Sequence, residues 1–387
     1  MFYFMKFLYL SILVSPEALR DAEKNDCNFS AYAVQKFHHL LTQGLVKNGV
    51  KVNALSTFYL PRVGWGYYRH SEYCDGVSFD YIPTVNISVL RHLWLTVYCF
   101  VRVLLFGLYN RHEKVLCCDV LNISACMGAV VAAKLVGLRR VGIVTDMPDF
   151  VMGGNRFAAR LNRKIISGFT HYVFLTEQMN SVLNVKSRPY IVMEGLVDSS
   201  FDVKEKRESD SKRILLYAGG LYEKYGLRLL IDGFINANVT NSELHLYGDG
   251  SFVDSIKEYS SHYPNVRYRG IQPNDIIVEK EREATLLVNP RPTNEEFTQY
   301  SFPSKNMEYM LSGTPLLTTK LPGMPKEYYP YVFLLEEESK EEYARKIHDI
   351  LSMPADGLKT KGQVAQHWVI ERKNNKVQAQ KIVDLVK

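Results

Sequence analysis

Short apolar runs and stretches with helical spacing alternate through the first half of the chain. The apolar runs have the length of strands and lie at residues 6–15, 50–57, 115–120, 139–146, 171–176 and 189–194. Between the first four runs lie amphipathic stretches, of which 30–49 and 124–138 have the clearest helical spacing. This alternation predicts a parallel sheet with helices on both faces, because parallel neighbours need long crossover connections that helices supply.

The same cycle begins again after a polar interruption at residues 197–213, which is charged and lacks periodic apolar positions, as expected for a linker. The second series of strand-like and helical stretches lies at 213–221, 225–237, 243–250, 265–270, 274–284, 285–292, 303–311 and 315–320. We therefore expect an α/β protein with two doubly wound domains, at residues 1–200 and 201–365. The final helical stretch begins at about Glu338, and we expect its last part, 366–387, to pack back on the first domain.

Two apolar stretches have compositions that fit either a membrane segment or an element of the protein core. The N-terminal run resembles a signal peptide because Lys6 precedes it, but no small-residue cleavage site follows and the run ends at Pro16. We interpret it as a buried first strand. Residues 90–110 are also apolar, but Arg102 interrupts them, and a spanning helix needs about 20 consecutive apolar residues. We expect a core or interfacial helix there.

Composition adds little that is specific to function. A chain of 387 residues with 47% hydrophobic and 23% charged side chains is typical of a globular protein with two cores. Its cysteines lie in the first third without CxxC spacing, so we expect reduced, buried thiols in a cytoplasmic protein, with no disulfide and no metal site. They are Cys27, Cys74, Cys99, Cys117, Cys118 and Cys126.

Positive charge is concentrated in the first half of the chain. Residues 1–195 carry 21 Lys and Arg against 13 Asp and Glu, a net charge of +8, whereas the remainder carries −2. Basic side chains recur at helical spacing in one stretch and adjoin an apolar stripe of Phe157, Leu161, Ile165 and Phe169; they are Arg156, Arg160, Arg163 and Lys164. This pattern favours a helix that binds an anionic lipid surface, and a solvated face of a packed helix is the alternative. No nucleic-acid-binding motif is present.

Candidate chemistry follows the strands of the second domain, since ligands of open parallel sheets bind outside the carboxyl ends of the strands. Gly219 and Gly220 follow the first strand of this domain, where their backbone N–H groups would bind a phosphate. Arg291 follows a later strand, and its guanidinium fork suits two phosphate oxygens. The alternatives are a simple turn for the glycines and a surface ion pair for Arg291.

A short helix beginning near Pro303 supplies the remaining candidates. Proline suits the first helical turn, and the N–H groups of that turn favour an anion. Ser301, Ser304 and Lys305 would add two hydroxyl groups and a positive charge. Glu308 lies one turn beyond Ser304 on the same face, so we expect its carboxylate to accept hydrogen bonds from vicinal hydroxyl groups, such as those of a ribose.

These residues carry a family resemblance. Residues 213–331, and especially NPRPTNEEFTQYSFPSKNMEYMLSGTPLL at 289–317, resemble family 4 retaining glycosyltransferases of bacterial polysaccharide assembly. The resemblance implies the GT-B architecture, two Rossmann-like domains that face each other across a cleft. It also implies transfer of a hexosyl-type sugar from a UDP- or GDP-sugar to a polyprenyl-linked or glycan acceptor, with retention at the anomeric carbon. No essential metal and no cofactor are implied, and the expected setting is capsule or surface polysaccharide synthesis at the inner face of the cell membrane.

The sequence departs from the family pattern at three places. Tyr300 stands where many members have the first of two glutamates, and Gly220 and Tyr225 align with an arginine and a lysine, for which Lys224 and Arg291 are our candidate substitutes. Asp146 or Thr145, rather than a histidine, follows a strand of the first domain, where Asp146 would orient or deprotonate an acceptor hydroxyl or cap a turn. These departures leave two alternatives open: a non-catalytic nucleotide-sugar-binding subunit and a nucleotide-sugar epimerase.

Overall fold

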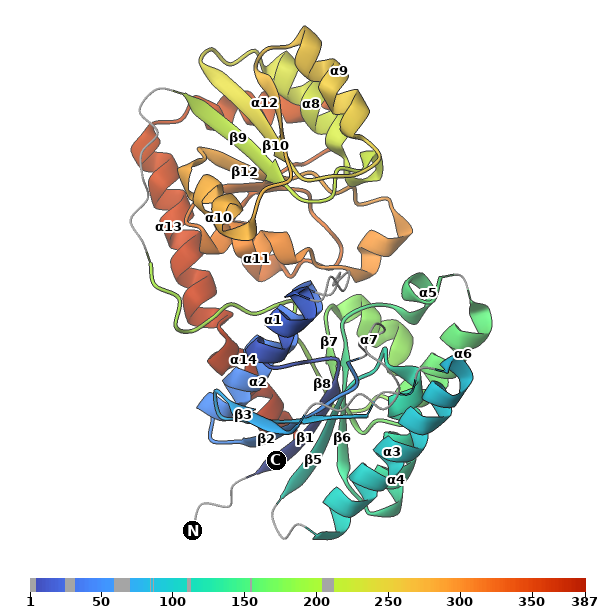
Figure 1. Cartoon of the computed structure of the whole chain (residues 1–387). Helices are drawn as coiled ribbons and strands as arrows, with labels where there is room; N and C mark the ends of the chain where they lie inside the picture. The colour runs from blue at the N-terminus through green and yellow to red at the C-terminus, as the bar shows by residue number, and fades with distance from the viewer. Residues whose placement is uncertain are drawn as a thin grey trace. The chain divides into compact units, whose positions relative to one another are not determined.

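The structure, a computed structural model, describes residues 5–24, 32–58, 70–83, 85, 87–109, 113–153, 155–203 and 212–387. The chain divides into two units (Figure 1). The first unit contains Met1–Asp198 together with Asn374–Lys387, and the second contains Ser199–Lys373. Each unit is a parallel sheet with helices on both faces, which agrees with the two doubly wound domains that the sequence predicts.

The sheet of the first unit has eight strands in the order β3-β4-β2-β1-β5-β6-β7-β8, and every pairing is parallel except that of β3 with β4. The N-terminal apolar run forms β1 in the middle of this sheet, and its residues Phe7 to Leu10 are buried, which confirms the interpretation as a strand. The strands are β1 (Lys6–Ser11), β2 (Lys51–Ser56), β3 (Glu72–Cys74), β4 (Val77–Tyr81), β5 (Lys114–Asp119), β6 (Arg139–Val144), β7 (His171–Phe174) and β8 (Tyr190–Val192).

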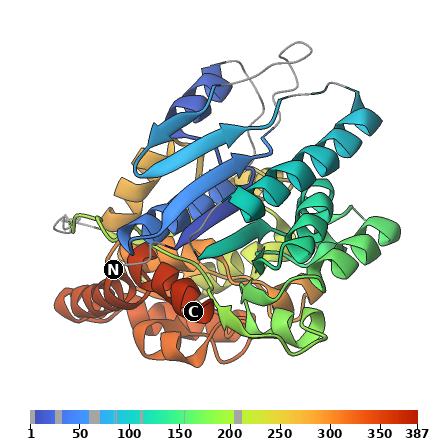
Figure 2. The same cartoon turned by 90° about the horizontal axis from the view of Figure 1, so that it is seen from below.

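Helices cover both faces of this sheet (Figures 1 and 2). On one face α2 and the C-terminal α14 pack together so closely that a Cβ at Gly44 would lie 2.1 Å from the carbonyl oxygen of Asn375. The chain returns to this unit where the N–H of Asn375 donates to the carbonyl of Val197 at 2.8 Å. The helices are α1 (Pro16–Lys24), α2 (Tyr32–Lys47), α3 (Ser88–Tyr109), α4 (Ile123–Leu135), α5 (Pro148–Val151), α6 (Arg156–Ile166), α7 (Glu177–Leu183) and α14 (Asn375–Leu385).

The cysteines are free thiols where the structure describes them. Cys117 and Cys118 are fully buried in β5, and burial raises the pKa of both thiols, so neither is a ready nucleophile. Cys99 and Cys126 are buried as well, Cys74 is half-buried, and Cys27 lies outside the described residues.

The second unit is a six-stranded parallel sheet in the order β11-β10-β9-β12-β13-β14. Strand order reverses between β9 and β12, because β10 and β11 continue on one side and β13 and β14 on the other. The loops after β9 and β12 therefore leave the sheet at a topological switch point, where ligands of such sheets bind. The strands are β9 (Arg213–Ala218), β10 (Ser242–Tyr247), β11 (Val266–Gly270), β12 (Leu286–Asn289), β13 (Leu316–Thr318) and β14 (Phe333–Leu334).

Nine helical segments surround this sheet in the described part of the second unit. They are η1 (Glu223–Tyr225), α8 (Leu227–Ala237), α9 (Val253–His262), α10 (Asn274–Glu283), η2 (Glu296–Tyr300), α11 (Ser304–Leu311), η3 (Lys326–Tyr331), α12 (Lys340–Leu351) and α13 (Ala355–Arg372). The helical stretch after Glu338 is thus three helices, of which α12 packs on α8 and only α14 belongs to the first unit. The sequence pattern also missed α9 and the β3–β4 hairpin, because α9 is mostly polar and the hairpin strands are short.

Candidate functional site

The loops that follow β9 and β12 contact each other at the switch point of the second unit. Gly226, between η1 and α8, has a φ of +83°, and a Cβ at this position would lie 2.0 Å from the carbonyl oxygen of Pro290. Only glycine tolerates both the positive φ and this close approach. The backbone at Gly226 therefore brings the loop after β9 against the residue that precedes Arg291.

Two buried contacts fix α11 at the same edge. The hydroxyl of Tyr309 accepts a hydrogen bond from the N–H of Ala218 at 2.9 Å and donates to the carbonyl of the same residue at 3.1 Å, at the end of β9. Asn289, at the end of β12, donates to the side-chain oxygen of Asn306 at 2.6 Å. The N-terminus of α11 is thus held beside the ends of both strands. The sequence analysis identified α11 but assigned no role to these three side chains.

Arg291 belongs to an aromatic–cation cluster made of Tyr222, Lys224, Tyr225, Arg291 and Phe297. Its guanidinium carbon lies 4.8 Å from the ring centroid of Tyr225 and 5.7 Å from that of Phe297. The Lys224 ammonium lies 5.7 Å from the Tyr225 ring. Among the described residues, no carboxylate and no hydrogen-bond acceptor engages the Arg291 guanidinium. Burial lowers the pKa of Arg291, but an arginine stays charged at neutral pH.

Lys305, unlike Arg291, lies beside carboxylates. Its ammonium lies 3.0 Å from a carboxylate oxygen of Glu308 and 4.0 Å from one of Glu281, a residue of α10 that is 2% exposed. Burial acts to lower the pKa of Lys305, but the Glu308 and Glu281 carboxylates outweigh it, so the pKa is raised. Lys305 is therefore charged and already compensated, and a phosphate would have to compete with these carboxylates.

The other residues predicted around α11 are present at the same edge. Pro303 occupies the position before the first helical residue rather than the first turn itself, and Ser304 is exposed at the start of the helix. The Ser301 hydroxyl is buried without a hydrogen-bond partner among the described residues, so it is available to a ligand. Tyr300 is half-buried at the end of η2.

The two glycines after β9 differ in what they offer. The N–H of Gly219 already donates to the carbonyl of Tyr247 at 3.0 Å, so it is not available for a phosphate. The carbonyl of Gly220 accepts from the Tyr217 hydroxyl at 2.9 Å, and a Cβ at Gly220 would lie 2.9 Å from the Tyr222 ring. The Gly219 N–H is therefore engaged within the protein, whereas phosphate binding by the Gly220 N–H stays a prediction.

In the first unit, Asp146 follows β6 and has an exposed side chain. The surrounding protein desolvates its carboxyl and raises its pKa, a hydrogen bond from Thr145 acts in the opposite direction, and the charge of Asp119 adds to the increase. Asp119, at the end of β5, lies 3.5 Å from His38, whose other ring nitrogen is 2.6 Å from the hydroxyl of Tyr9. Acidic groups thus collect at the carboxyl edge of this sheet.

The predicted basic helix is α6, and its charged face is largely solvated. Arg156, Arg160 and Lys164 are exposed, whereas Arg163 pairs with Asp149. The apolar stripe is divided, because Phe157 is 76% exposed while Ile165 and Phe169 are buried. An exposed phenylalanine beside exposed cations is compatible with both readings, lipid binding and a solvated face.

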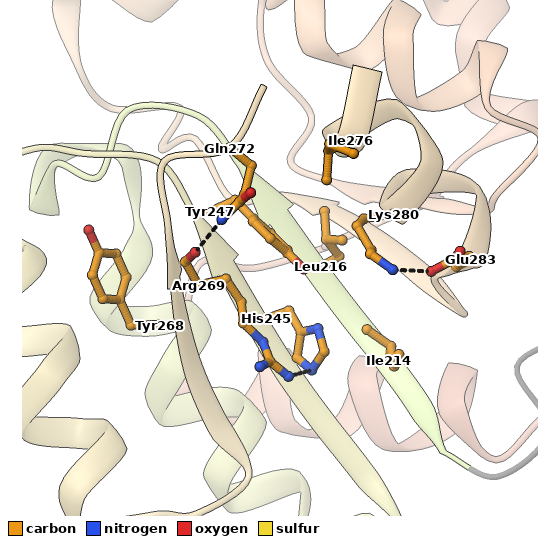
Figure 3. Close-up of a pocket in the computed structure, with 10 residues that line it drawn as sticks. All are labelled: Ile214, Leu216, His245, Tyr247, Tyr268, Arg269, Gln272, Ile276, Lys280 and Glu283. Carbon is orange, nitrogen blue, oxygen red and sulfur yellow. Dashed lines mark hydrogen bonds and ion pairs between the residues drawn. The ribbon is translucent and has the colours of Figure 1, made fainter. Parts of the chain in front are cut away.

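The structure also contains a cavity of about 570 Å³ away from these residues (Figure 3). It lies between α10 and the faces of β9, β10 and β11, with Leu216, Tyr247 and Ile276 among its lining residues. Its charged groups are satisfied within the protein, since Lys280 bonds Glu283 and Arg269 bonds His245. We do not assign the phosphate-binding residues to this cavity. In the described part of the chain, no group of three or more His, Cys, Asp or Glu is arranged for a metal ion.

Comparison with known proteins agrees with this architecture. Residues 212–353 match the family model described as "Glycosyl transferases group 1". No curated protein sequence matches the chain. Among solved structures, the chain resembles the lipopolysaccharide outer core galactosyltransferase WaaB in its apo form, with 15% identity, a TM-score of 0.64 and 99% of each chain covered.

Two further structures are similar over nearly their whole length. Anabaena HepE in complex with UDP has 13% identity and a TM-score of 0.63, with 98% of this chain and 99% of that chain covered. Sucrose-phosphate synthase from Thermosynechococcus elongatus has 12% identity and a TM-score of 0.65, with 98% of each chain covered. At these identities the likeness concerns the fold, which is the two-domain GT-B fold of glycosyltransferases.

Proposed function

We propose that the chain is a retaining glycosyltransferase that moves a hexosyl-type sugar from a UDP- or GDP-sugar to a lipid-linked or polysaccharide acceptor. The single observation that carries this proposal is the Arg291 guanidinium, which is charged, half-buried and without an anionic partner among the described residues at the switch point of the second unit. The match of residues 212–353 to the glycosyl transferases group 1 model supports it.

The diphosphate would bind between Arg291 and the first turn of α11. Arg291 offers a bidentate donor on an aromatic platform. In the first turn of α11 the Asn306 N–H donates to the Pro303 carbonyl, so the N–H groups of Ser304 and Lys305 are the ones we assign to the diphosphate. When the bond from the anomeric carbon to the diphosphate breaks, negative charge accumulates on the departing phosphate oxygens, and these groups would stabilise it. Cationic side chains of the protein would neutralise this negative charge, so the reaction would need no metal and no cofactor.

The Lys305–Glu308 pair suggests a second step in donor binding. A diphosphate near the start of α11 would attract Lys305 away from Glu308, which lies 3.0 Å from it. The carboxylate released in this way would accept hydrogen bonds from the ribose hydroxyls. A carboxylate oxygen of Glu281 lies 4.0 Å from the Lys305 ammonium. Glu281 would therefore partly compensate the charge of Lys305 both before and after the diphosphate binds.

We assign the acceptor hydroxyl to the first unit. The acceptor oxygen would bond to the anomeric carbon on the face that the diphosphate leaves, and its proton would have to pass to a base. Asp146 is our candidate for orienting this hydroxyl or taking up its proton, since its raised pKa places it nearer to the range useful for a base. UDP is the first nucleotide to test, because HepE was solved with UDP and with UDP and glucose.

The setting we propose is the cytoplasmic face of the cell membrane, in capsule or surface polysaccharide synthesis. The exposed basic face of α6, with Arg156, Arg160 and Lys164, would hold the protein near anionic lipids that carry a lipid-linked acceptor.

The experiment is a panel of UDP- and GDP-sugars added to the purified protein. We expect at least one donor to raise the unfolding temperature, and free UDP or GDP to appear once a polyprenyl-linked acceptor is supplied. The anomeric configuration of the product, read by NMR, tests retention. Donor binding without turnover on native acceptors would favour a non-catalytic subunit, and exchange of solvent deuterium into the donor without acceptor would favour an epimerase. Failure of every donor to bind would contradict the proposal.

A further inference from the structure

An extended apolar surface is exposed on α3 and α4 of the first unit. On α3 the exposed apolar side chains recur at i, i+3 and i+4 spacing, so they form one stripe along the whole helix. They are Leu90, Leu93, Trp94, Val97, Val101, Leu105 and Leu108, with exposed fractions from 36% to 64%. On α4 the exposed apolar residues are Met127, Val131 and Leu135, again one face of a helix.

The stripe belongs to a helix that is firmly attached to its unit. A Cβ at Gly128 of α4 would lie 1.9 Å from the carbonyl oxygen of Thr96, so the two helices pack at backbone distance. Arg102 pairs with Asp80 of β4, and the side chains of Cys99, Val103 and Phe106 are buried on the inner face of α3. Figure 2 shows α3 and α4 side by side at the flank of the sheet.

The composition of α3 excludes an ordinary solvated surface. The helix is long and apolar enough to cross a membrane by length and composition, yet only 17% of its most apolar window is buried. Large contiguous apolar patches on a protein surface mark sites of protein or membrane interaction. The attachment of α3 to α4 and to Asp80 favours a helix that lies flat on a bilayer over one that crosses it.

Charge decides between a lipid surface and a second copy of the chain. Helices α3, α4 and α6 together contain seven Lys and Arg and no Asp or Glu, and two of the seven, Arg102 and Arg163, pair with Asp80 and Asp149 of neighbouring elements. Helix α6 neighbours α4, and Gly168 at its end lies against Val130. Two copies packed through this surface would bring like charges together, whereas an anionic bilayer offers apolar chains for the stripe and phosphates for the cations.

We infer that the exposed faces of α3 and α4 enter an anionic bilayer at the boundary between headgroups and acyl chains, with α3 parallel to the membrane plane. The stripe from Leu90 to Leu108 is about 27 Å long at the rise of an α-helix. This inference deepens the membrane part of the proposed function and rests on it for its biological purpose, but binding to lipid needs no sugar donor.

The test is flotation of the full-length protein with vesicles of phosphatidylcholine alone and of phosphatidylcholine mixed with phosphatidylglycerol, at low and high salt. The variant Leu93→Gln/Val97→Gln/Val101→Gln removes the apolar stripe without adding charge. Its matched control is Tyr73→Gln/Val185→Gln, because both of these side chains are 74% exposed in the same unit but lie outside α3 and α4. Arg160→Gln/Lys164→Gln removes charge from α6 and leaves the stripe intact.

We expect the wild type to float with the anionic vesicles and to keep part of its binding at high salt, where surface charges are screened. The partition coefficient of the stripe variant between buffer and vesicles should fall by about tenfold or more at both salt concentrations, since apolar burial drives insertion. The control should behave as the wild type, and the α6 variant should lose chiefly the salt-sensitive part. Circular dichroism and the unfolding temperature check that each variant is folded.

Equal flotation of the stripe variant and the wild type would overturn the inference. So would a wild-type dimer in light scattering that the stripe variant dissociates while neither protein binds vesicles, because a second copy would then cover the surface. UDP binding by each variant reports on the second unit separately. A protein that binds lipid but no nucleotide would contradict the proposed function and leave this inference standing.

Discussion

The carboxyl edges of the two parallel sheets have opposite chemical character. In the second unit the edge presents cations, with Arg291 and Lys224 over aromatic rings and Lys305 beside α11. In the first unit the edge contains Asp119, which is buried beside His38, and Asp146, which is exposed. The carboxyl edges of the two sheets therefore differ in the charge of their side chains, although both sheets are built from parallel strands.

Under the proposed function, this difference would separate two binding tasks on scaffolds of one kind. A cation held by aromatic rings keeps its charge available, whereas a cation held by a carboxylate must exchange its partner before it binds an anion. The edge of the second unit contains both kinds and suits a diphosphate. The carboxylates of the first unit would repel a diphosphate but suit a hydroxyl group that has to be oriented or deprotonated.

The largest effect should come from Arg291→Ala, which removes the available cation. We expect the affinity for a UDP-sugar to fall by about 10- to 100-fold, since a charge-assisted hydrogen bond contributes roughly 1.5 to 3 kcal/mol. Isothermal titration calorimetry measures it. Arg267→Ala is the matched control, because Arg267 is a half-exposed arginine of the same unit that already has Glu243 as its partner at 3.7 Å. An equal loss of UDP-sugar affinity in both variants would show that Arg291 does not bind the diphosphate specifically.

Glu308→Ala should be next in size and separates two roles of this carboxylate. If Glu308 binds the ribose, the affinity for uridine, which has no phosphates, should fall by about tenfold. If Glu308 only neutralises Lys305, the freed ammonium should instead tighten UDP binding. Titration of uridine and UDP into the same variant distinguishes the two roles, and unchanged uridine affinity would refute the first.

Asp146→Asn tests the acidic edge of the first unit. The pKa of Asp146 is raised above its ordinary value, so the ionised form that we assign to the acceptor is lost as the pH falls through that raised pKa. The transfer rate of the wild type should therefore decline on the acid side, and the variant should be slower by about tenfold at neutral pH and lack this limb. UDP affinity should not change. An unaltered pH–rate profile would assign Asp146 to a turn cap.

The smallest effect should come from Tyr225→Leu, which removes the ring 4.8 Å from the Arg291 guanidinium. A cation–π contact of this kind contributes about 0.5 to 2 kcal/mol, so we expect a loss of several-fold in UDP affinity. Tyr222→Leu is the control, since the structure gives that ring a contact with Lys224 and none with Arg291. Equal behaviour of the two variants would show that the platform under Arg291 is unimportant.

Local patterns in the sequence predicted the two doubly wound units, the strand at Lys6–Ser11 and the helix beginning at Ser304, because each depends on periodicity and turn residues within a short window. They did not predict the partners of the site. Tyr309 reaches Ala218 across 91 residues, and Glu281 approaches Lys305 from another helix. The hydrogen bond that occupies the Gly219 N–H likewise depends on how β9 and β10 align.

A crystal structure of the protein with UDP tests the central claim most directly. We predict the diphosphate at the switch point of the second unit, with its oxygens about 3 Å from the Arg291 guanidinium and the first N–H groups of α11. The ribose hydroxyls should contact Glu308, and Lys305 should have moved toward the phosphates. A diphosphate bound in the cavity between α10 and β9 to β11, or held without Arg291, would contradict the account.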